Sequence, residues 1–230
     1  EWSEPELHKD SYKPPPGTVM VIDPPDGKAP LQPWALAKRN YIREHWFEKP
    51  EYVDSRVRCL PAGPRHTFQS GYNGWQVIQT PGYVMILQEH NHNWRIIPIV
   101  KAGAPKPHVG SKIELWQGDS VGHWEGNTLV IEATNFTDKT WVLGEIGGEG
   151  MSVGTFHSQK LKMTERWTWK DQNNVDYEAT IEDPNVYTKP WKIALGVWKR
   201  APKTYENYEY ACHEGNKWEE LIPASQKSTK

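Results

Sequence analysis

The stretch that decides the fold class is residues 160–182, KLKMTERWTWKDQNNVDYEATIE. Two runs rich in branched and aromatic residues, 160–170 and 175–182, flank the polar segment 171–174. Asp and Asn favour turns, because their side chains hydrogen-bond the nearby backbone and tolerate left-handed conformations. The stretch therefore predicts an antiparallel β-hairpin.

The alternation within the first run assigns its two faces. Side chains along a strand point to opposite sides in turn. The face that holds Met163 and Trp167 also holds Glu165, whereas Lys162, Arg166 and their neighbours make the other face polar. If the apolar face is the core, Glu165 points inward. A buried carboxylate must then be paired or hydrogen-bonded, or its pKa rises.

Further strands are predicted on both sides of this hairpin. A second hairpin is predicted around Glu125-Gly126-Asn127, and most of the other runs are separated by turn residues such as Pro81-Gly82. So many short strands with one helix favour a mainly β fold, either an antiparallel lipocalin-like β-barrel or a sandwich with one N-terminal helix. The predicted strands, besides the 160–182 hairpin, are residues 75–80, 83–89, 94–100, 122–124, 128–135, 191–198 and 204–212.

The N-terminal part of the chain differs in composition. Residues 1–33 are dense in proline and read as an extended arm, with a short strand predicted at 18–22. A helix is predicted over 33–48, where Trp34, Ala37 and Tyr41 recur at spacings of three and four. We therefore expect a single domain overall, with an arm and helix over 1–58 and an antiparallel β-domain over 59–230.

Charge and hydropathy exclude several classes of partner. The 230 residues carry a net charge of -2, with acids and bases interspersed, so no basic surface for nucleic acid is predicted. No apolar run approaches the roughly 18–20 residues that a membrane helix needs. We expect neither a nucleic acid nor a membrane as partner. Monomer and homodimer both stay open.

Two cysteines, Cys59 and Cys212, lie far apart in the sequence. An even pair, in a chain that opens at Glu1 without Met, favours a processed protein with one disulfide that is secreted or periplasmic. The alternative is two free buried thiols in a cytosolic protein.

More polar residues fall on predicted inner faces, which suggests a ligand site with preset charges in an aromatic-lined interior. The alternative is a structural Arg–Glu pair that braces the core, and a register slip of one residue would move any of these side chains to the solvent. The residues are Glu89 on the face of Tyr83, Arg95 on the face of Ile97, and Gln79 on the face of Trp75.

The histidines give weaker signals. His90 and His92 are two residues apart, and a metal-dependent enzyme that uses this pair is a third reading. A pair of ligands alone is little evidence for metal, so we predict no metal site. His157 follows the glycine-rich segment 144–154, which resembles a flap and not a phosphate cradle. His213 directly follows Cys212, where a disulfide would hold it for proton transfer.

These features support a first hypothesis, a cofactor-independent lyase or isomerase that acts by acid–base catalysis on a small, plant-derived aromatic compound such as a lignin-type phenolic. No nucleophile-elbow, zinc-protease or dinucleotide motif is present. Glu165 or His213 would act as base or acid, Arg95 would stabilise negative charge, and His157 would act from the flap. The residues expected to contact the substrate are Glu89, Gln79, Trp167, Tyr177, Trp191 and Tyr83.

The second hypothesis is a non-catalytic protein, either a carrier of small ligands or a carbohydrate-binding barrel. It would use the same aromatic wall, which the thirteen Trp and ten Tyr residues suggest. Replacing Glu165 by Gln separates the two hypotheses, because an enzyme would lose turnover while a carrier would change only in affinity.

Three motifs stand at residues 118–120 with 122–130 (GDS and GHWEGNTLV), 164–167 (TERW) and 209–216 (EYACHEGN). Together they resemble a family of exported bacterial proteins of no established reaction. The resemblance runs from about Cys59 to Asn216 and implies export and a β-rich fold. The family pattern has Arg at the position of His123 and Asp at that of Asn127.

Overall fold

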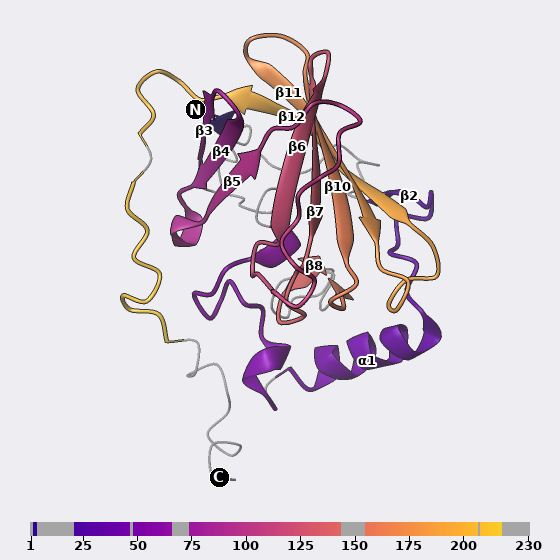
Figure 1. Cartoon of the computed structure of the whole chain (residues 1–230). Coiled ribbons are helices and arrows are strands. Elements are labelled where there is room, and N and C mark those ends of the chain that lie inside the picture. The colour runs from indigo at the N-terminus through magenta and orange to yellow at the C-terminus, as the bar shows by residue number, and fades with distance from the viewer. Residues whose placement is uncertain are drawn as a thin grey trace.

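The computed structural model describes residues 2–3, 21–46, 48–65, 74–143, 155–206 and 208–217. Over these residues the chain is mainly β, with antiparallel strand pairing, as the sequence predicts (Figure 1). The strands are β1 (Trp2–Ser3), β2 (Val21–Asp23), β3 (Trp75–Thr80), β4 (Tyr83–Gln88), β5 (Trp94–Pro98), β6 (Asp119–Glu125), β7 (Thr128–Thr134), β8 (Trp141–Leu143), β9 (Thr155–Phe156), β10 (Lys162–Trp169), β11 (Asn174–Glu182) and β12 (Trp191–Arg200). The helices are α1 (Pro33–Glu44) and the 3₁₀ turns η1 (Pro50–Tyr52), η2 (Gly63–Arg65) and η3 (His90–His92).

Both predicted hairpins are confirmed. Strands β10 and β11 pair from Lys162 opposite Glu182 to Trp169 opposite Val175. Asp171 accepts hydrogen bonds from the backbone N–H of Asn173 and the side chain of Asn174, which closes the turn. In the β6–β7 hairpin Gly126 adopts a positive φ of 61°, a conformation that glycine takes without steric cost.

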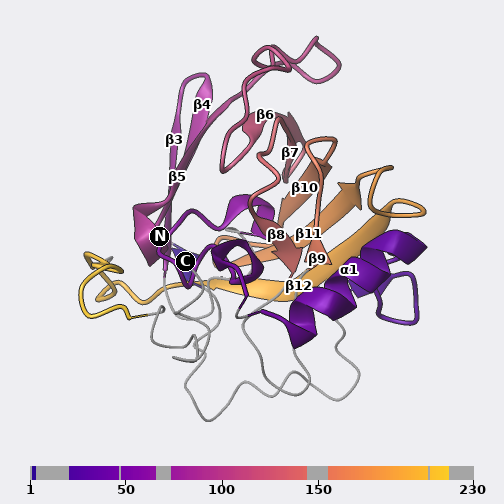
Figure 2. The same ribbon diagram turned by 90° about the horizontal axis from the view of Figure 1, so that it is seen from below.

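Ten strands form one sheet in the order β5-β4-β3-β1-β12-β11-β10-β7-β6, with β2 also paired to β12. Figure 2 shows the β3–β5 wall turned toward the wall of β6, β7 and β10. The two edge strands therefore approach each other, and a parallel bridge joins Ile99 to Gly122. A β-carbon at Gly122 would lie 3.0 Å from Ile99 and 3.1 Å from Ile97, so glycine permits this close approach.

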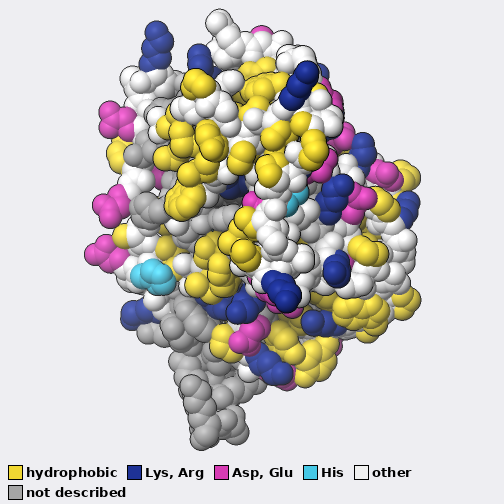
Figure 3. Space-filling view, viewed as in Figure 1, with side chains coloured by type: hydrophobic (Ala, Val, Ile, Leu, Met, Phe, Trp, Pro, Cys, Tyr) yellow, Lys and Arg dark blue, Asp and Glu magenta, His cyan; other side chains and the backbone are white. Residues whose placement is uncertain are grey.

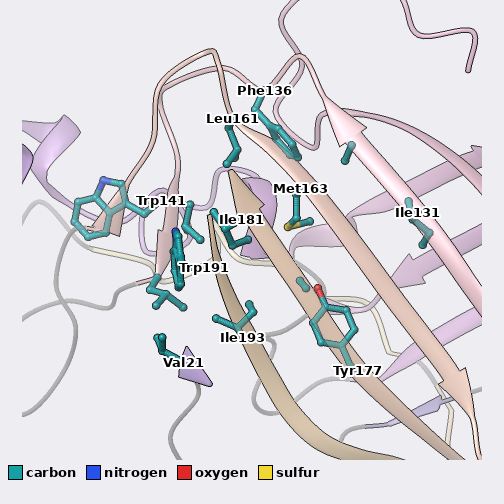
Figure 4. Packing of buried hydrophobic residues seen from close by; sticks show 14 of the residues in the cluster. Val21, Ile131, Phe136, Trp141, Leu161, Met163, Tyr177, Ile181, Trp191 and Ile193 are labelled. Carbon is teal, nitrogen blue, oxygen red and sulfur yellow. The ribbon is translucent and has the colours of Figure 1, made fainter. Parts of the chain in front are cut away.

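The core lies on the concave side of the sheet. Met163 and Trp167 of β10 are buried as predicted, and so are Val175, Tyr177 and their alternate neighbours on β11. Figure 4 shows how side chains from adjacent strands meet on this face. Four large aromatic rings pack with centroids 4.2–5.8 Å apart, a spacing typical of favourable ring contacts. They are Trp75, Trp167, Tyr177 and Trp198.

Helix α1 confirms the predicted N-terminal helix and ends at Glu44, four residues before the predicted end. Pro33 stands in its first turn, where a missing N–H leaves no hydrogen bond unmade. Ala35 and Ile42 are buried in the same hydrophobic cluster as the sheet, whereas Trp34 is 52% exposed. None of the described helices is long and apolar enough to cross a membrane.

Two segments named in the sequence analysis lie partly or wholly outside the described residues. The glycine-rich segment 144–154 is among these, and the structure covers only the small β8–β9 pair on either side of it. Of the strand predicted at 18–22, residues 21 and 22 belong to β2.

The predicted strand over 204–212 is wrong. The described residues of this tail form turns and irregular structure. Strand β12 already pairs with β11 on one side and with β1 and β2 on the other, so the tail finds no free edge there. The tail is held instead by the predicted disulfide between Cys59 and Cys212, which joins segments 153 residues apart, and by stacking of Tyr210 on His90.

The predicted faces of β4 are inverted. Val84, Ile86 and Gln88 are buried, whereas Tyr83 and Leu87 are exposed. The reason is that residues 83–87 are all apolar, so the run has no alternation from which a core face could be chosen.

Candidate functional site

A buried ion pair lies at the centre of the molecule. Glu165 is fully buried on β10, and its Oε1 lies 2.7 Å from Nη1 of Arg95 on β5. Arg95 is 3% exposed and donates to Oγ of Ser120 on β6, from Nη2 at 2.6 Å and from Nε at 3.2 Å. The inward direction predicted for Glu165 and Arg95 is confirmed. The guanidinium thus links β10 with both edge strands.

Aromatic hydrogen-bond donors surround the other carboxylate oxygen. Trp167 Nε1 lies 3.3 Å and the Tyr177 hydroxyl 3.4 Å from Oε2 of Glu165. Both rings belong to the close-packed aromatic group of the core, so the carboxylate has no path to solvent between them. Removing one member of such a pair leaves an uncompensated buried charge and costs about 3–5 kcal/mol. As arranged, the cluster braces the fold.

A cleft of about 470 Å³ opens on the other side of Arg95. It lies between the two edge strands, at the end away from the Ile99–Gly122 bridge, and the segment before β6 closes its far wall. In Figure 3 hydrophobic side chains gather around a hollow near the centre of this face. Its lining residues are Pro61, Asn91, Asn93, Trp94, Arg95, Ile96, Leu115, Trp116, Gln117, Gly118, Asp119 and Ser120.

The wall from the segment before β6 has little regular structure but is well anchored. Asn135 donates from Nδ2 to the carbonyls of Val109, Gly110 and Ile113 at 3.0–3.3 Å. Asp119 accepts from the Val109 N–H at 2.8 Å and lies 2.9 Å from His108 Nδ1. These bonds hold the wall in one position, which favours a preformed site.

The cleft combines an apolar rim with polar lining residues. Trp94 is 63% and Ile96 50% exposed, which is unusual for large apolar side chains beside one another. Both amide atoms of Gln117 and Oδ1 of Asn91 have no hydrogen-bond partner among the described residues, but these atoms are enclosed by protein and are not open to the cleft. Trp75 Nε1 and Trp191 Nε1 are unpartnered in the same way outside the cleft lining, so this property alone does not mark a ligand site.

The predicted substrate-contacting residues are scattered. Glu89 is half-buried and accepts a 2.7 Å hydrogen bond from Tyr205, so it anchors the tail. Gln79 and Tyr83 are exposed at the β3–β4 turn, which contradicts the inner-face position predicted for Gln79. Trp191 is fully buried against Tyr187, away from the cleft lining.

His157 is buried and does not reach Arg95 or Glu165. Its Nδ1 lies 3.0 Å from the Ser158 carbonyl and must carry the proton, so Nε2 accepts from the Thr140 hydroxyl at 2.8 Å. Burial is the main influence and lowers the pKa of His157 below its ordinary value. A neutral, enclosed imidazole of this kind serves as a structural link between β9 and the segment before β8.

His213 lies on an exposed turn of the tail. Among the described residues it has no hydrogen bond or ion pair with Arg95 or Glu165, so the predicted catalytic group is not assembled. His90 is buried against Tyr210, and the side chain of His92 is outside the described part. No cluster of three metal-ligating side chains occurs within the described ranges.

No protein-family model matches the chain, and no match occurs among curated proteins or solved structures. The resemblance to exported bacterial proteins therefore stays a prediction. Its three motifs are nevertheless placed by the fold, since GHWEGNTLV forms the β6–β7 hairpin, TERW carries Glu165, and EYACHEGN contains the disulfide-bonded Cys212.

Apart from Arg95, sequence reasoning missed the residues that line the cleft. Asn91, Gln117 and Ser120 lie in or next to irregular segments, where no periodicity indicates which way a side chain points. One signal was present, because Leu115-Trp116-Gln117-Gly118-Asp119 brings an aromatic, an amide and a glycine directly before a hairpin.

Proposed function

We propose that this protein binds a small, flat, partly apolar molecule in the cleft between β5 and β6. The observation that carries the proposal is an exposed apolar rim, Trp94 and Ile96, in one cleft with the polar residues Arg95 and Ser120. Ligand sites commonly combine an apolar lining with a few convergent polar groups, and a volume of about 470 Å³ suits a one- to three-ring compound.

The geometry supports binding better than acid–base catalysis. Glu165 is sealed behind Arg95 and the core rings, so it does not line the cleft. Arg95 does line it, but its guanidinium is engaged by Glu165 and Ser120. A general base needs to be within hydrogen-bond reach of its substrate, and here the cluster serves as the rigid inner wall of the site.

The test is a comparison of two exposed tryptophans. Binding of a panel of aromatic compounds is measured by calorimetry for the wild type, Trp94→Ala and Trp34→Ala. Trp94→Ala removes stacking area from the cleft rim and is expected to weaken binding about tenfold. Trp34 lies on α1, away from the cleft lining, and is 52% exposed, so Trp34→Ala is the matched control. Equal affinities for all three proteins would exclude this cleft as the site.

A second candidate is the lyase or isomerase reaction on an aromatic compound. The observation in its favour is that Arg95, a cation of the kind that stabilises developing negative charge on a substrate, lines the cleft. Product analysis by mass spectrometry and chromatography tests it. A product formed by wild type and lost in Glu165→Gln with binding retained would favour catalysis, and ligand recovered intact would favour a carrier.

Two finer features accompany the proposal. We propose that the curved sheet acts as an incomplete lipocalin-like barrel, with the cleft at its seam, since the Ile99–Gly122 bridge and the Arg95–Ser120 hydrogen bonds join its edges. We also propose that the protein works outside the cytoplasm, because the Cys59–Cys212 disulfide persists best in an oxidising compartment. Thiol titration of protein isolated from the native cell fractions tests the second point.

A further inference from the structure

The side of the β3–β5 wall that faces away from the core is largely apolar and has no charged side chain. Ile78 lies opposite Met85, and Met85 opposite Ile96, in the middle row of three cross-strand rows. Side chains alternate along a strand, so these residues point outward while Val84 and Ile86 are buried in the core. Nine residues form this surface, which we call the β3–β5 outer face: Gln76, Ile78, Thr80, Tyr83, Met85, Leu87, Trp94, Ile96 and Pro98.

The outer face of β10–β12, in the same sheet, is built differently. Lys170 pairs with Asp176 at 2.7 Å, and Lys192 pairs with Glu178 at 2.8 Å. Antiparallel sheets that have one face in water commonly carry polar side chains on that face. The β3–β5 outer face departs from this pattern, as expected for a surface that another molecule covers.

The amount of exposed surface on the β3–β5 outer face suits a protein–protein contact. Tyr83 is 47% and Leu87 36% exposed, in addition to the strongly exposed Trp94 and Ile96. These four side chains together expose roughly 450 Å², more than half of the about 800 Å² that each partner buries in a stable interface. The other five residues of the face add to this area. Figure 3 shows hydrophobic side chains gathered over β4 and β5.

We propose that two copies of this chain form a symmetric dimer in which their β3–β5 outer faces pack against each other. A two-fold contact sets a surface against itself, so a charge on it would meet a like charge, and this face carries none. A partner of opposite charge has nothing to recognise here. Two sheet faces stacked about 10 Å apart bury their side chains as the two layers of a β-sandwich do.

The proposed dimer face borders the cleft. Trp94 and Ile96 belong both to the β3–β5 outer face and to the rim of the cleft. In the dimer the second copy would therefore lie next to the mouth of the cleft. The inference goes beyond the proposed function and does not rest on it, because self-association is measured without a ligand.

The experiment is sedimentation equilibrium of wild type, Leu87→Lys, Tyr83→Lys and Leu36→Lys, with urea denaturation to show that each variant is folded. Leu87 and Tyr83 lie in different rows of the face and outside the cleft lining, so either variant suffices if the other fails to fold. Leu36 is 44% exposed on α1, so Leu36→Lys repeats the chemical change elsewhere as a control.

Wild type is expected to sediment with twice the mass of one chain. Leu87→Lys and Tyr83→Lys should each raise the Kd of the dimer at least about a hundredfold, because each substitution places two buried like charges in a symmetric interface. Leu36→Lys should behave as wild type.

Three results would overturn the inference. The first is a wild type that stays monomeric at about 100 μM; if that monomer co-sediments with phosphatidylcholine vesicles, the face belongs to a lipid surface instead. The second is a dimer that neither Leu87→Lys nor Tyr83→Lys weakens, and the third is a dimer that Leu36→Lys weakens equally. Each leaves ring binding in the cleft to be decided by calorimetry.

Discussion

Two polar groups lie on opposite sides of one arginine, and they are built in opposite ways. On the inner side, the Glu165 carboxylate is fully buried and meets Arg95, Trp167 and Tyr177. On the outer side, the polar residues Asn91 and Gln117 line an open cleft beside a strongly exposed Trp94. The inner group is satisfied within the fold, whereas the outer group lies beside apolar surface that is still open to a ligand.

The difference indicates which group stabilises and which binds. A charge that is already paired and enclosed has little free energy left for a ligand, and exposing it would cost several kcal/mol. An exposed aromatic ring such as Trp94 has the opposite property, because covering its apolar surface with a ligand is favourable. Burial and charge alone point to Glu165, but the exposed apolar surface points to the cleft.

The largest expected effect is the loss of stability when Glu165, on the inner side of Arg95, is replaced. Glu165→Ala leaves Arg95 buried and unpaired and is expected to lower the free energy of unfolding by about 3–5 kcal/mol, measured by urea denaturation. The double variant Arg95→Met with Glu165→Leu should recover most of the loss. The control is Glu125→Ala, which breaks the exposed Arg166–Glu125 pair and should change stability little. Equal effects of the two alanine variants would contradict a bracing role.

Removal of the disulfide is expected to cause a smaller loss of stability, and it should also affect ligand binding in the cleft. Replacing Cys59 and Cys212 by Ser is expected to lower the free energy of unfolding by about 2–4 kcal/mol. Pro61 lines the cleft and Leu60 accepts from Asn91, so ring binding should weaken as well. Denaturation and calorimetry with and without reductant measure both changes. A reduced protein of unchanged stability and affinity would refute the role assigned to this bond.

The smallest expected effect is the pH dependence of stability that arises from His157. The folded-state pKa of His157 is lowered by burial, so the unfolded chain binds a proton there at a higher pH than the folded one does. The contribution of His157 to the free energy of unfolding is therefore complete above the unfolded-state pKa. It is lost as the pH falls from there through the folded-state pKa. The slope is at most about 1.4 kcal/mol per pH unit.

The matching experiment measures urea denaturation of wild type and His157→Gln between pH 8 and pH 5. The variant should lose less stability than wild type as the pH falls, because it lacks the buried imidazole. An identical pH dependence would mean that other groups cause the acid sensitivity. Ring binding in the cleft should be unaffected, since His157 is not among its lining residues.

Much of the inner side could be predicted from the sequence. Residues 160–182 alternate strictly, so the period of two placed Glu165, Trp167 and Tyr177 on the core face. The same reasoning failed for β4, whose apolar run gives no choice of face, and for residues 204–212, whose alternation suits a strand but finds no free sheet edge. Strand pairing is a property of the whole chain, which a local pattern does not contain.

The cleft could not be predicted in the same way. It forms where the two ends of the sheet approach without pairing along their length, and strands β5 and β6 are separated by an irregular segment of twenty residues, 99–118. Its lining residues come from three separate parts of the chain, and a local pattern does not contain their approach. Three dimensions are needed to identify such a site.

The most direct test of the central claim is an NMR titration that follows the indole N–H signals of the tryptophans while an aromatic ligand is added. Trp94 and Trp116 line the cleft, whereas Trp167 and Trp198 lie in the sealed core. We predict saturable shifts of the two cleft signals, assigned with Trp94→Phe and Trp116→Phe, and unchanged core signals. Saturable shifts of the core signals with the cleft signals unmoved would contradict the account and indicate that the ligand binds in the interior around Glu165.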